Sequence, residues 1–338
     1  MKKILFLLLA IVILAAPFGV SADTHEYTVY DFLAEFVEAC PSRVAGTDGE
    51  TEAAAFLADK FAQIGFTDVT LDDFTFTDLD DALRNSQNVV AKYHSEQSLG
   101  TIIVGAHYDN VRVGEGANDN GSGVAVMLDI ASRLVGQSLA YDVVFIAFGA
   151  EEQGFFGSQS YVADMKSAEK QNVLLMVNID SVAMGDKVYF FGEDKATALN
   201  AKMTELANGL GYSQKAYEKP LWKDLNVLPI ADGTIPYYHT GYASDNIYFR
   251  IAGIPTEFIF SGNFDTGLTV YTQSEREELR NMHTTADTLE TLSKLFGDEA
   301  KQNMQIASDT VVNVLTNADF EAIILNARSE LADKIFWE

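Results

Sequence analysis

Cysteine is almost absent from this sequence, which has 338 residues and a single thiol at Cys40. One cysteine forms no intramolecular disulfide and cannot supply a thiolate zinc cluster. We therefore expect Cys40 to be a buried packing residue, with the fold stabilised by its core and by metal ions. Proline is also scarce, with six residues, and no repeat, low-complexity tract or Pro/Ser-rich linker divides the chain. With 48% hydrophobic residues, the sequence is compatible with one large globular domain or two small ones.

Positive charge is the second deficit. The sequence has 23 Lys and Arg residues against 49 Asp and Glu residues, which gives a formal net charge of −26. Because a polyanionic chain repels phosphate backbones, nucleic acid is a poor partner. Most of these acids are expected on the solvated surface, and any that bind metal would be partly neutralised by the cations.

Long apolar runs are confined to the N-terminus. Lys2 and Lys3 precede an apolar run over residues 4–16, and Val20-Ser21-Ala22 offers small residues for cleavage. A run this short favours a signal peptide over a retained membrane anchor. We expect residues 1–22 to be a signal peptide. Residues 23–338 would then form the mature protein, secreted or periplasmic and without a stable membrane anchor.

Apolar runs alternate with helical patterns through the rest of the chain. Such runs, bounded by turns and separated by helices, are typical of a sheet covered by helices on both faces. An antiparallel pair of strands is expected first. The fold class is therefore a single α/β domain with a central, mostly parallel but mixed, twisted sheet. The expected strands are 68–77, 87–94, 101–106, 142–148, 173–179, 188–191 and 255–260, and the expected helices are about 51–66, 122–134, 158–165, 196–209, 289–295, 299–315 and 320–335.

Two histidines and three carboxylates lie mostly where apolar runs break into polar or glycine-rich turns. Ligands gather beyond the carboxyl ends of strands in open α/β sheets, so positions that follow three of these strands should converge. The donor set suits two zinc ions that share one bridging carboxylate. The five residues are His107, Asp119, Glu152, Asp180 and His283.

Each of these residues also has an ordinary alternative role, such as a core histidine or a turn aspartate. Asp119 lies in the glycine-dense segment 114–123, where an N-cap is the usual use of aspartate, but glycines also let the backbone approach a site closely. We expect Asp119 to bridge both metals, and a strained or cis peptide bond after it is compatible with that role. Asp109 is expected to accept a hydrogen bond from the second ring nitrogen of His107.

Glu151 and Glu152 follow an apolar strand directly. Neighbouring side chains in extended backbone point in opposite directions, so one can bind metal while the other reaches over a water molecule. We expect Glu152 to be the ligand and Glu151 the general base, because metals lower the pKa of water toward ~7. The alternative is two exposed glutamates at a helix start. The sequence has no H-E-x-x-H, G-x-S-x-G, phosphate-loop or C-x-x-C motif, so metal-assisted hydrolysis is favoured.

The segments GAHYD, NDNGSG, AEEQGFFGS and NID resemble, in this order, the metal motifs of the M28 family of dizinc metallopeptidases, especially bacterial secreted aminopeptidases. The similarity runs from about Ser42 to Leu292 and includes SRVAGT, GYASD and HTTAD. It implies a phosphorylase/hydrolase-like zinc exopeptidase fold, with residues 23–338 as the catalytic domain. It also implies one zinc ion on His107 and Asp180, the other on Glu152 and His283, and a bridging hydroxide that attacks with the help of Glu151.

The resemblance extends to the substrate side of the site. Tyr242 matches a tyrosine that helps to stabilise the oxyanion in some members, and Asp245 would lie behind the ligands or face the substrate. Asn246 departs from the histidine often found at its position. The implied substrates are peptides with a free N-terminus, whose amine would dock near the acids. A carboxypeptidase would need a cation such as Arg112 or Arg250.

Two other functions stay open. A glutaminyl cyclase on the same scaffold would bind one zinc ion, and a non-catalytic binding protein would keep the fold without the reaction. Retention of all five ligand positions and of Glu151 favours the hydrolase. Co²⁺ or Mn²⁺ can share these ligands with Zn²⁺. The sequence indicates neither the preferred N-terminal side chain nor the oligomeric state.

Overall fold

The computed structural model describes residues 27–78, 80–191, 198–210, 227–228, 237–238, 244–262 and 281–332. The expected signal peptide and Tyr242 lie outside these residues. The strands are β1 (Asp68–Thr77), β2 (Leu83–Tyr93), β3 (Thr101–His107), β4 (Asp142–Phe148), β5 (Val173–Ile179), β6 (Lys187–Phe191), β7 (Val227–Leu228), β8 (Tyr237–Tyr238) and β9 (Thr256–Gly262). The helices are α1 (Val29–Ala39), α2 (Asp48–Ile64), α3 (Gly123–Leu134), α4 (Phe156–Asp164), α5 (Ser167–Asn172), α6 (Ala198–Gly209), α7 (Asn246–Ile251), α8 (Leu289–Leu295), α9 (Asp298–Thr316) and α10 (Glu321–Ala332).

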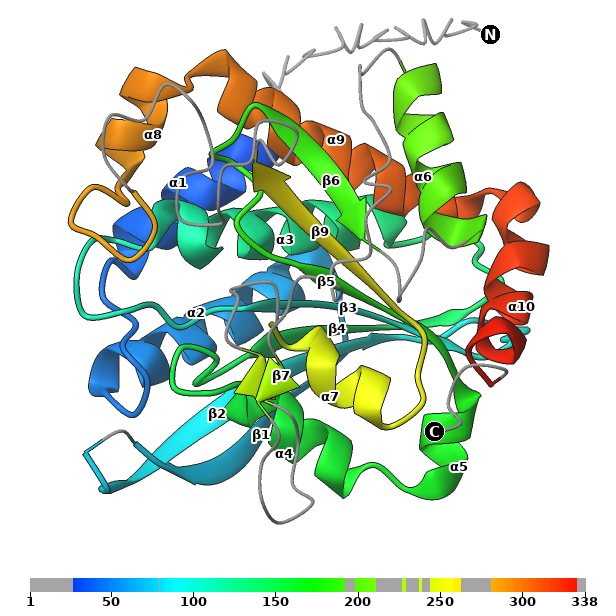
Figure 1. Ribbon diagram of the computed structural model, residues 1–338, viewed down its shortest axis with the longest axis horizontal. Coiled ribbons are helices and arrows are strands. Elements are labelled where there is room, and N and C mark those ends of the chain that lie inside the picture. Colours follow the sequence, from blue (N-terminus) through cyan, green and yellow to red (C-terminus); the bar gives the residue numbers. More distant parts are fainter. Residues whose placement is uncertain are drawn as a thin grey trace, which may run out of the picture.

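A mixed sheet of seven strands forms the centre of the molecule, in the order β1-β2-β4-β3-β5-β9-β6 (Figure 1). The neighbours β4, β3, β5 and β9 run parallel to one another. The pairs β1–β2, β2–β4 and β6–β9 are antiparallel. The expected mixed sheet with a parallel centre is therefore confirmed, and so is the antiparallel pair that precedes it.

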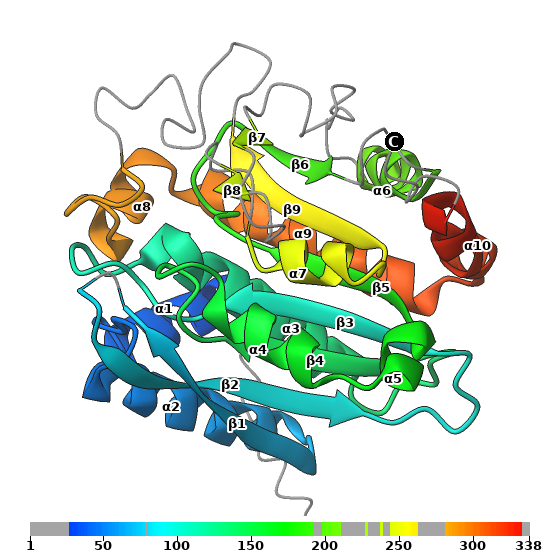
Figure 2. The same ribbon diagram turned by 60° about the horizontal axis from the view of Figure 1, so that its bottom comes forward.

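Helices cover both faces of this sheet. One face carries α1, α2, α3 and α9, and the other carries α4, α5 and α7 (Figure 2). Because the central strands are covered on both sides, their apolar side chains are buried on both sides. On β3, Ile102 and Val104 belong to the larger core cluster, whereas Ile103 points to the smaller one. This explains why the central strands read as continuous apolar runs.

Local signals set several of the element ends. Thr28 accepts a hydrogen bond from the N–H of Asp31 while the Asp31 carboxylate accepts one from the N–H of Thr28, which is a capping box at the start of α1. Helix α2 ends at Gly65, whose φ of 122° is accessible to glycine without strain. Cys40 follows α1 and is buried with 7% of its surface exposed, as expected for a packing residue.

Several elements differ from the expectations, among them the two-residue strands β7 and β8, which were not expected. Helices α5 and α7 have six residues each and are too short to show a helical period. Strand β2 begins at Leu83, four residues before the expected start, because its first residues are exposed and lack an apolar pattern. Among the described residues, no helix has both the length and the apolar character needed to cross a membrane.

Phe145 on β4 offers a test of the larger core cluster. It is fully buried, and its ring centroid lies 6.0 Å from that of Phe61 and 5.5 Å from that of Phe66. Replacement by alanine should lower the free energy of unfolding by about 3–5 kcal/mol, because it leaves a cavity between α2 and the sheet. Denaturant titration measures the change. Leu83→Ala is the control, since 74% of Leu83 is exposed and a change within about 0.5 kcal/mol is expected.

Candidate metal centre

The topology brings the predicted site residues to one edge of the sheet. His107 is the last residue of β3, Glu151 and Glu152 follow β4, and Asp180 follows β5. These three strands are parallel neighbours, so their carboxyl ends meet at the same edge. Asp119 lies in the turn Ala117–Ser122 ahead of α3, and His283 lies in the segment ahead of α8. All six residues are among those described.

The donor atoms form two groups. His107, Glu151 and Asp180 each offer one donor atom, and these atoms lie within 4.8 Å of one another. Asp119, Glu152 and His283 form the second such group. In the second group, His283 Nε2 lies 3.1 Å from Glu152 Oε2.

Asp119 connects the two groups. Its Oδ1 lies 3.2 Å from His107 Nε2, and its Oδ2 lies 3.0 Å from His283 Nε2. His107 Nε2 also lies 3.6 Å from Asp180 Oδ1. Ligands at ~2.1 Å from a tetrahedral zinc ion are separated by roughly 3.4 Å, so these spacings match those of ligands around a cation. The buried Glu152 Oε1 has no hydrogen-bond partner within the described part of the chain. This oxygen is therefore available to bind a metal ion. The residues present therefore fit a pair of divalent cations.

The electrostatics of the cluster favour positive charge. Burial opposes the charged form of His283, but Asp119 and Glu152 raise its pKa to about 11. Burial likewise opposes protonation of His107, yet Glu151 and Asp180 raise its pKa well above 6.5. Burial and the neighbouring Asp119 raise the pKa of Glu152 to about 7. A cluster that binds protons this strongly would also bind cations, and metal binding would release those protons.

Glu151 is placed differently from its neighbour. The donor atom of Glu151 groups with His107 and Asp180, whereas that of Glu152 groups with Asp119 and His283. The two consecutive glutamates therefore face different parts of the cluster. Burial raises the pKa of Glu151 well above 4.5, against the opposing charge of His107. A buried carboxyl with a raised pKa is suited to accept and return a proton near neutral pH.

Asp109 fixes the segment that carries both glutamates. Its two carboxylate oxygens accept hydrogen bonds from the N–H groups of Glu151, at 3.0 Å, and Glu152, at 3.2 Å. His107 Nδ1 lies 3.2 Å from the main-chain carbonyl oxygen of Asp109 and 3.5 Å from its carboxylate. Asp109 thus faces the second ring nitrogen of His107 through both its main chain and its side chain. It also joins the ends of β3 and β4.

Asp287 is a buried acid directly ahead of α8 that the sequence motifs did not assign to the site. Thr288 caps α8, and its hydroxyl accepts a hydrogen bond from the N–H of Thr291. The buried Asp287 carboxylate instead accepts from the N–H groups of Asn118, at 2.7 Å, and Asp119, at 3.0 Å. The turn that carries Asp119 is therefore tied to the segment that carries His283. The peptide bond after Asp119 is cis, in agreement with the expectation for this turn.

Glu50 is a second buried acid without an earlier assignment. One of its oxygens accepts from the Ala150 N–H at 3.1 Å and from the Ser86 hydroxyl at 2.7 Å, and the other accepts from the Gly46 N–H at 2.6 Å. These contacts hold the main chain directly ahead of Glu151. Burial raises the pKa of Glu50 to about 8. Asp245 is fully buried ahead of α7, where burial raises its pKa to about 7 and His107 opposes the rise.

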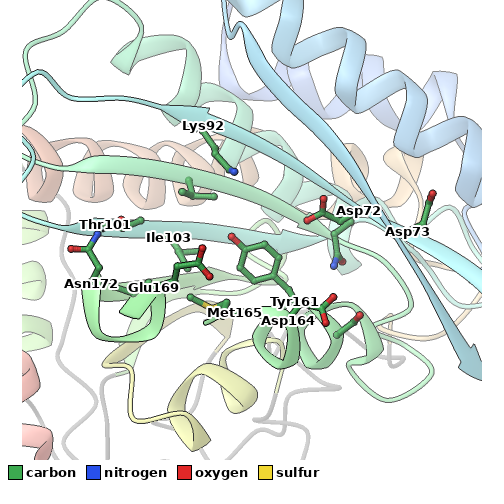
Figure 3. A pocket seen from close by; sticks show the side chains of 14 residues that line it. Asp72, Asp73, Lys92, Thr101, Ile103, Tyr161, Asp164, Met165, Glu169 and Asn172 are labelled. Carbon is green, nitrogen blue, oxygen red and sulfur yellow. Dashed lines mark hydrogen bonds between the residues drawn. The ribbon is translucent and has the colours of Figure 1, made fainter. Parts of the chain in front are cut away.

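A separate cavity of about 310 Å³ lies against the sheet beside α4 and α5 (Figure 3). Its apolar floor includes Ile103, and its polar lining includes Asp72, Lys92, Tyr161 and Glu169. None of the predicted metal ligands lines it. The cavity is therefore not part of the candidate metal centre.

A mixed α/β sheet with imidazoles and carboxylates gathered beyond its parallel strands places the chain in the class of metallopeptidase-like α/β proteins. The sequence model of peptidase family M28 matches residues 88–306. Since this match covers more than half of the chain, the protein belongs to peptidase family M28, and the resemblance seen in the sequence motifs is confirmed.

Similar sequences and solved structures agree with this family assignment. Aminopeptidase YwaD of Bacillus subtilis is 31% identical over 245 residues, which cover 71% of this chain and 45% of that protein. The chain spans about half or less of the length of the curated relatives it matches. The solved structure of BSAP, a zinc aminopeptidase from Bacillus subtilis, has a TM-score of 0.69 at 17% identity and covers 87% of this chain and 96% of that chain. Porphyromonas gingivalis glutaminyl cyclase has a TM-score of 0.64 at 21% identity, with 85% and 95% covered. At these identities the two structures show a shared fold.

Proposed function

We propose that the protein is a metallo-aminopeptidase that removes N-terminal residues from peptides with a free N-terminus. Membership of the M28 family and the name of the Bacillus subtilis relative support this activity. The observation that carries it is the position of Asp119, which directs one carboxylate oxygen toward each histidine of the cluster. A carboxylate shared in this way suits a pair of catalytic metal ions held close together.

The proposed ligands follow the two groups of donor atoms. His107 and Asp180 would hold one zinc ion, Glu152 and His283 would hold the other, and Asp119 would bridge them. When bound, the two ions would lower the pKa of a water molecule and polarise the scissile carbonyl group. Co²⁺ or Mn²⁺ are possible substitutes, because they accept the same ligands.

The side chains around the ligands have separate proposed roles. Glu151 takes a proton from the attacking water and passes it to the leaving amine, and burial keeps bulk water away from this transfer. Asp109 keeps Glu151 and Glu152 in place through their N–H groups. Tyr242, outside the described residues, is proposed to stabilise the oxyanion, and Asp245 to act behind the ligands or beside the substrate. The carboxylates of the centre outnumber its histidines, so a positively charged substrate amine would be attracted to the site.

A glutaminyl cyclase is the second candidate, and the fold shared with the Porphyromonas gingivalis enzyme favours it. Such an enzyme would bind one zinc ion. The two groups of donor atoms, each with its own histidine, favour two ions and therefore the peptidase. A non-catalytic binding protein is disfavoured because the proton-accepting Glu151 is retained beside the donors. We further propose that residues 1–22 direct export, with residues 23–338 as the catalytic domain.

Metal analysis combined with a substrate panel tests the proposal. Purified protein should contain about two zinc ions per chain. It should hydrolyse amino-acyl p-nitroanilides with a free amine and leave their N-acetylated counterparts intact, because the amine must dock at the acids. Elemental analysis and absorbance at the p-nitroaniline band give the two results.

Other outcomes of this panel point to other enzymes. One zinc ion per chain together with cyclisation of N-terminal glutamine would establish the cyclase. Cleavage of N-blocked peptides would move the activity to an endopeptidase or a carboxypeptidase. Two bound ions without turnover of any substrate on the panel would favour the binding protein.

A further inference from the structure

Arg43 is a fully buried cation in the connection between α1 and α2. Its guanidinium group donates hydrogen bonds to four main-chain carbonyl oxygens and lies 4.7 Å from the centre of the Phe36 ring. The four acceptors are those of Cys40 at 2.8 Å, Tyr108 at 2.6 Å, Glu115 at 2.9 Å and Gly116 at 3.0 Å. No carboxylate takes part in these bonds, so the side chain binds backbone in place of an ion-pair partner.

Three of these carbonyl groups belong to segments that carry proposed ligands. Tyr108 directly follows His107, and Glu115 and Gly116 open the segment that leads to Asp119. The main chain of Arg43 adds a further tie to the first segment, because its N–H donates to the Asn110 side-chain oxygen at 2.7 Å. A single residue thus joins the ends of two ligand segments that are separate in the sequence.

The positive charge of Arg43 interacts with three aspartates at the centre. Burial lowers the pKa of Arg43 to about 10, while Asp287, Asp109 and Asp119 act in the opposite direction. An apolar side chain of similar volume would fill the same space without the cost of burying a cation. Packing alone therefore does not account for an arginine at this position.

We propose that Arg43 is a positioning residue of the metal centre. It fixes the main chain after His107 and ahead of Asp119, and its charge offsets part of the repulsion among the buried carboxylates. This inference rests on the proposed two-metal site. Because its guanidinium group donates to main-chain carbonyl groups, Arg43 acts through the segments that it holds.

The shape of the guanidinium group explains why lysine cannot replace it. Arginine offers five N–H donors in a fixed planar fork, whereas lysine offers three donors on one atom. Nε, Nη1 and Nη2 of Arg43 each point to a different set of carbonyl oxygens. Arg43→Lys keeps the charge but leaves some of these buried carbonyl groups without a donor. The segments they hold should then move relative to each other.

The test compares Arg43→Lys and Arg43→Met with a control, Arg133→Met. Arg133 is a partly buried arginine of α3 that pairs with Asp309 of α9 at 2.8 Å, and it contacts none of the proposed ligands. Metal-free full-length protein is titrated with Co²⁺ while visible absorption and circular dichroism are recorded. We expect both Arg43 variants to bind Co²⁺ about 10–100-fold more weakly, with an altered cobalt spectrum. Arg133→Met should change the melting temperature alone.

The possible results separate a role in the centre from a role in the fold. Wild-type cobalt affinity and spectrum in folded Arg43→Lys would overturn the inference. Failure of Arg43→Met to fold leaves the decision to Arg43→Lys, and failure of Arg43→Lys as well would assign the residue to the fold and count against the proposal. The inference about Arg43 survives if wild-type protein binds cobalt but cleaves no peptide. In that case the proposed function fails alone.

Discussion

Replacement of Glu151 by glutamine should lower kcat about 10²–10⁴-fold while both metal ions stay bound. Glutamine keeps the size of the side chain but cannot accept the proton of the attacking water. The surroundings of Glu151 support this role, because burial raises the pKa of its carboxyl while His107 lies close enough to oppose the rise. The main chain of Glu151 is held by the Asp109 carboxylate, so the variant should keep the local structure.

Glu152→Gln is the matched comparison, since it makes the same chemical change one residue along the chain. Glu152 is a proposed ligand whose Oε2 lies 3.1 Å from His283 Nε2, so this variant should lose metal as well as rate. Elemental analysis and steady-state kinetics on a free-amine substrate distinguish the two variants. The donor atom of Glu151 also lies near His107 and Asp180. Loss of metal from Glu151→Gln would therefore make Glu151 a ligand and end its assignment as general base.

Part of the candidate metal centre could be predicted from the sequence, because the order of strands determines where the residues after them lie. The central strands are marked by apolar runs, and parallel neighbours direct the residues after them to one edge of the sheet. His107, Glu152 and Asp180 follow from that rule. Asp119 and His283 do not lie at the ends of central strands. The glycine-dense turn indicated the first. The second was one of two histidines chosen because they lie near breaks in apolar runs, and the family resemblance supports that choice.

The supporting residues were harder to predict. Arg43, Glu50 and Asp287 are buried charged residues that bind main-chain N–H or carbonyl groups. Every residue except proline carries both groups, so a sequence gives no pattern that pairs a side chain with a particular one. Asp287 shows the difficulty well. Its position before α8 favours an N-cap, yet its carboxylate reaches the N–H of Asp119 in a different part of the chain.

The same reasoning explains which fold features were missed. Long apolar strands were predicted with their ends close to those observed, because burial on both faces determines their composition. Helix α7 has only six residues and is too short to show a helical period, so no pattern indicates its start. Its place matters for the site, because the buried Asp245 directly precedes it.

Asp119→Asn should reduce the metal content from about two ions per chain to one or fewer. The two oxygens of Asp119 face different histidines, at 3.2 Å and 3.0 Å. Asparagine replaces one of these oxygens with an NH₂ group, which is a hydrogen-bond donor and does not bind a cation. The variant also removes one negative charge from the cluster. Both effects weaken the two positions together, whereas loss of a ligand to one ion alone should spare the other.

Elemental analysis after dialysis gives the metal content, and thermal unfolding with and without a chelator gives its effect on stability. Because ligands that bind only the folded state stabilise it, chelation should lower the melting temperature of wild-type protein and affect Asp119→Asn much less. Asp129→Asn is the control: Asp129 is a buried aspartate of α3 that pairs with Arg133, and its variant should keep both ions. Two tightly bound ions in Asp119→Asn would show that no shared carboxylate is needed. The two histidine groups would then act as independent sites, and a shared water between them would lose its structural basis.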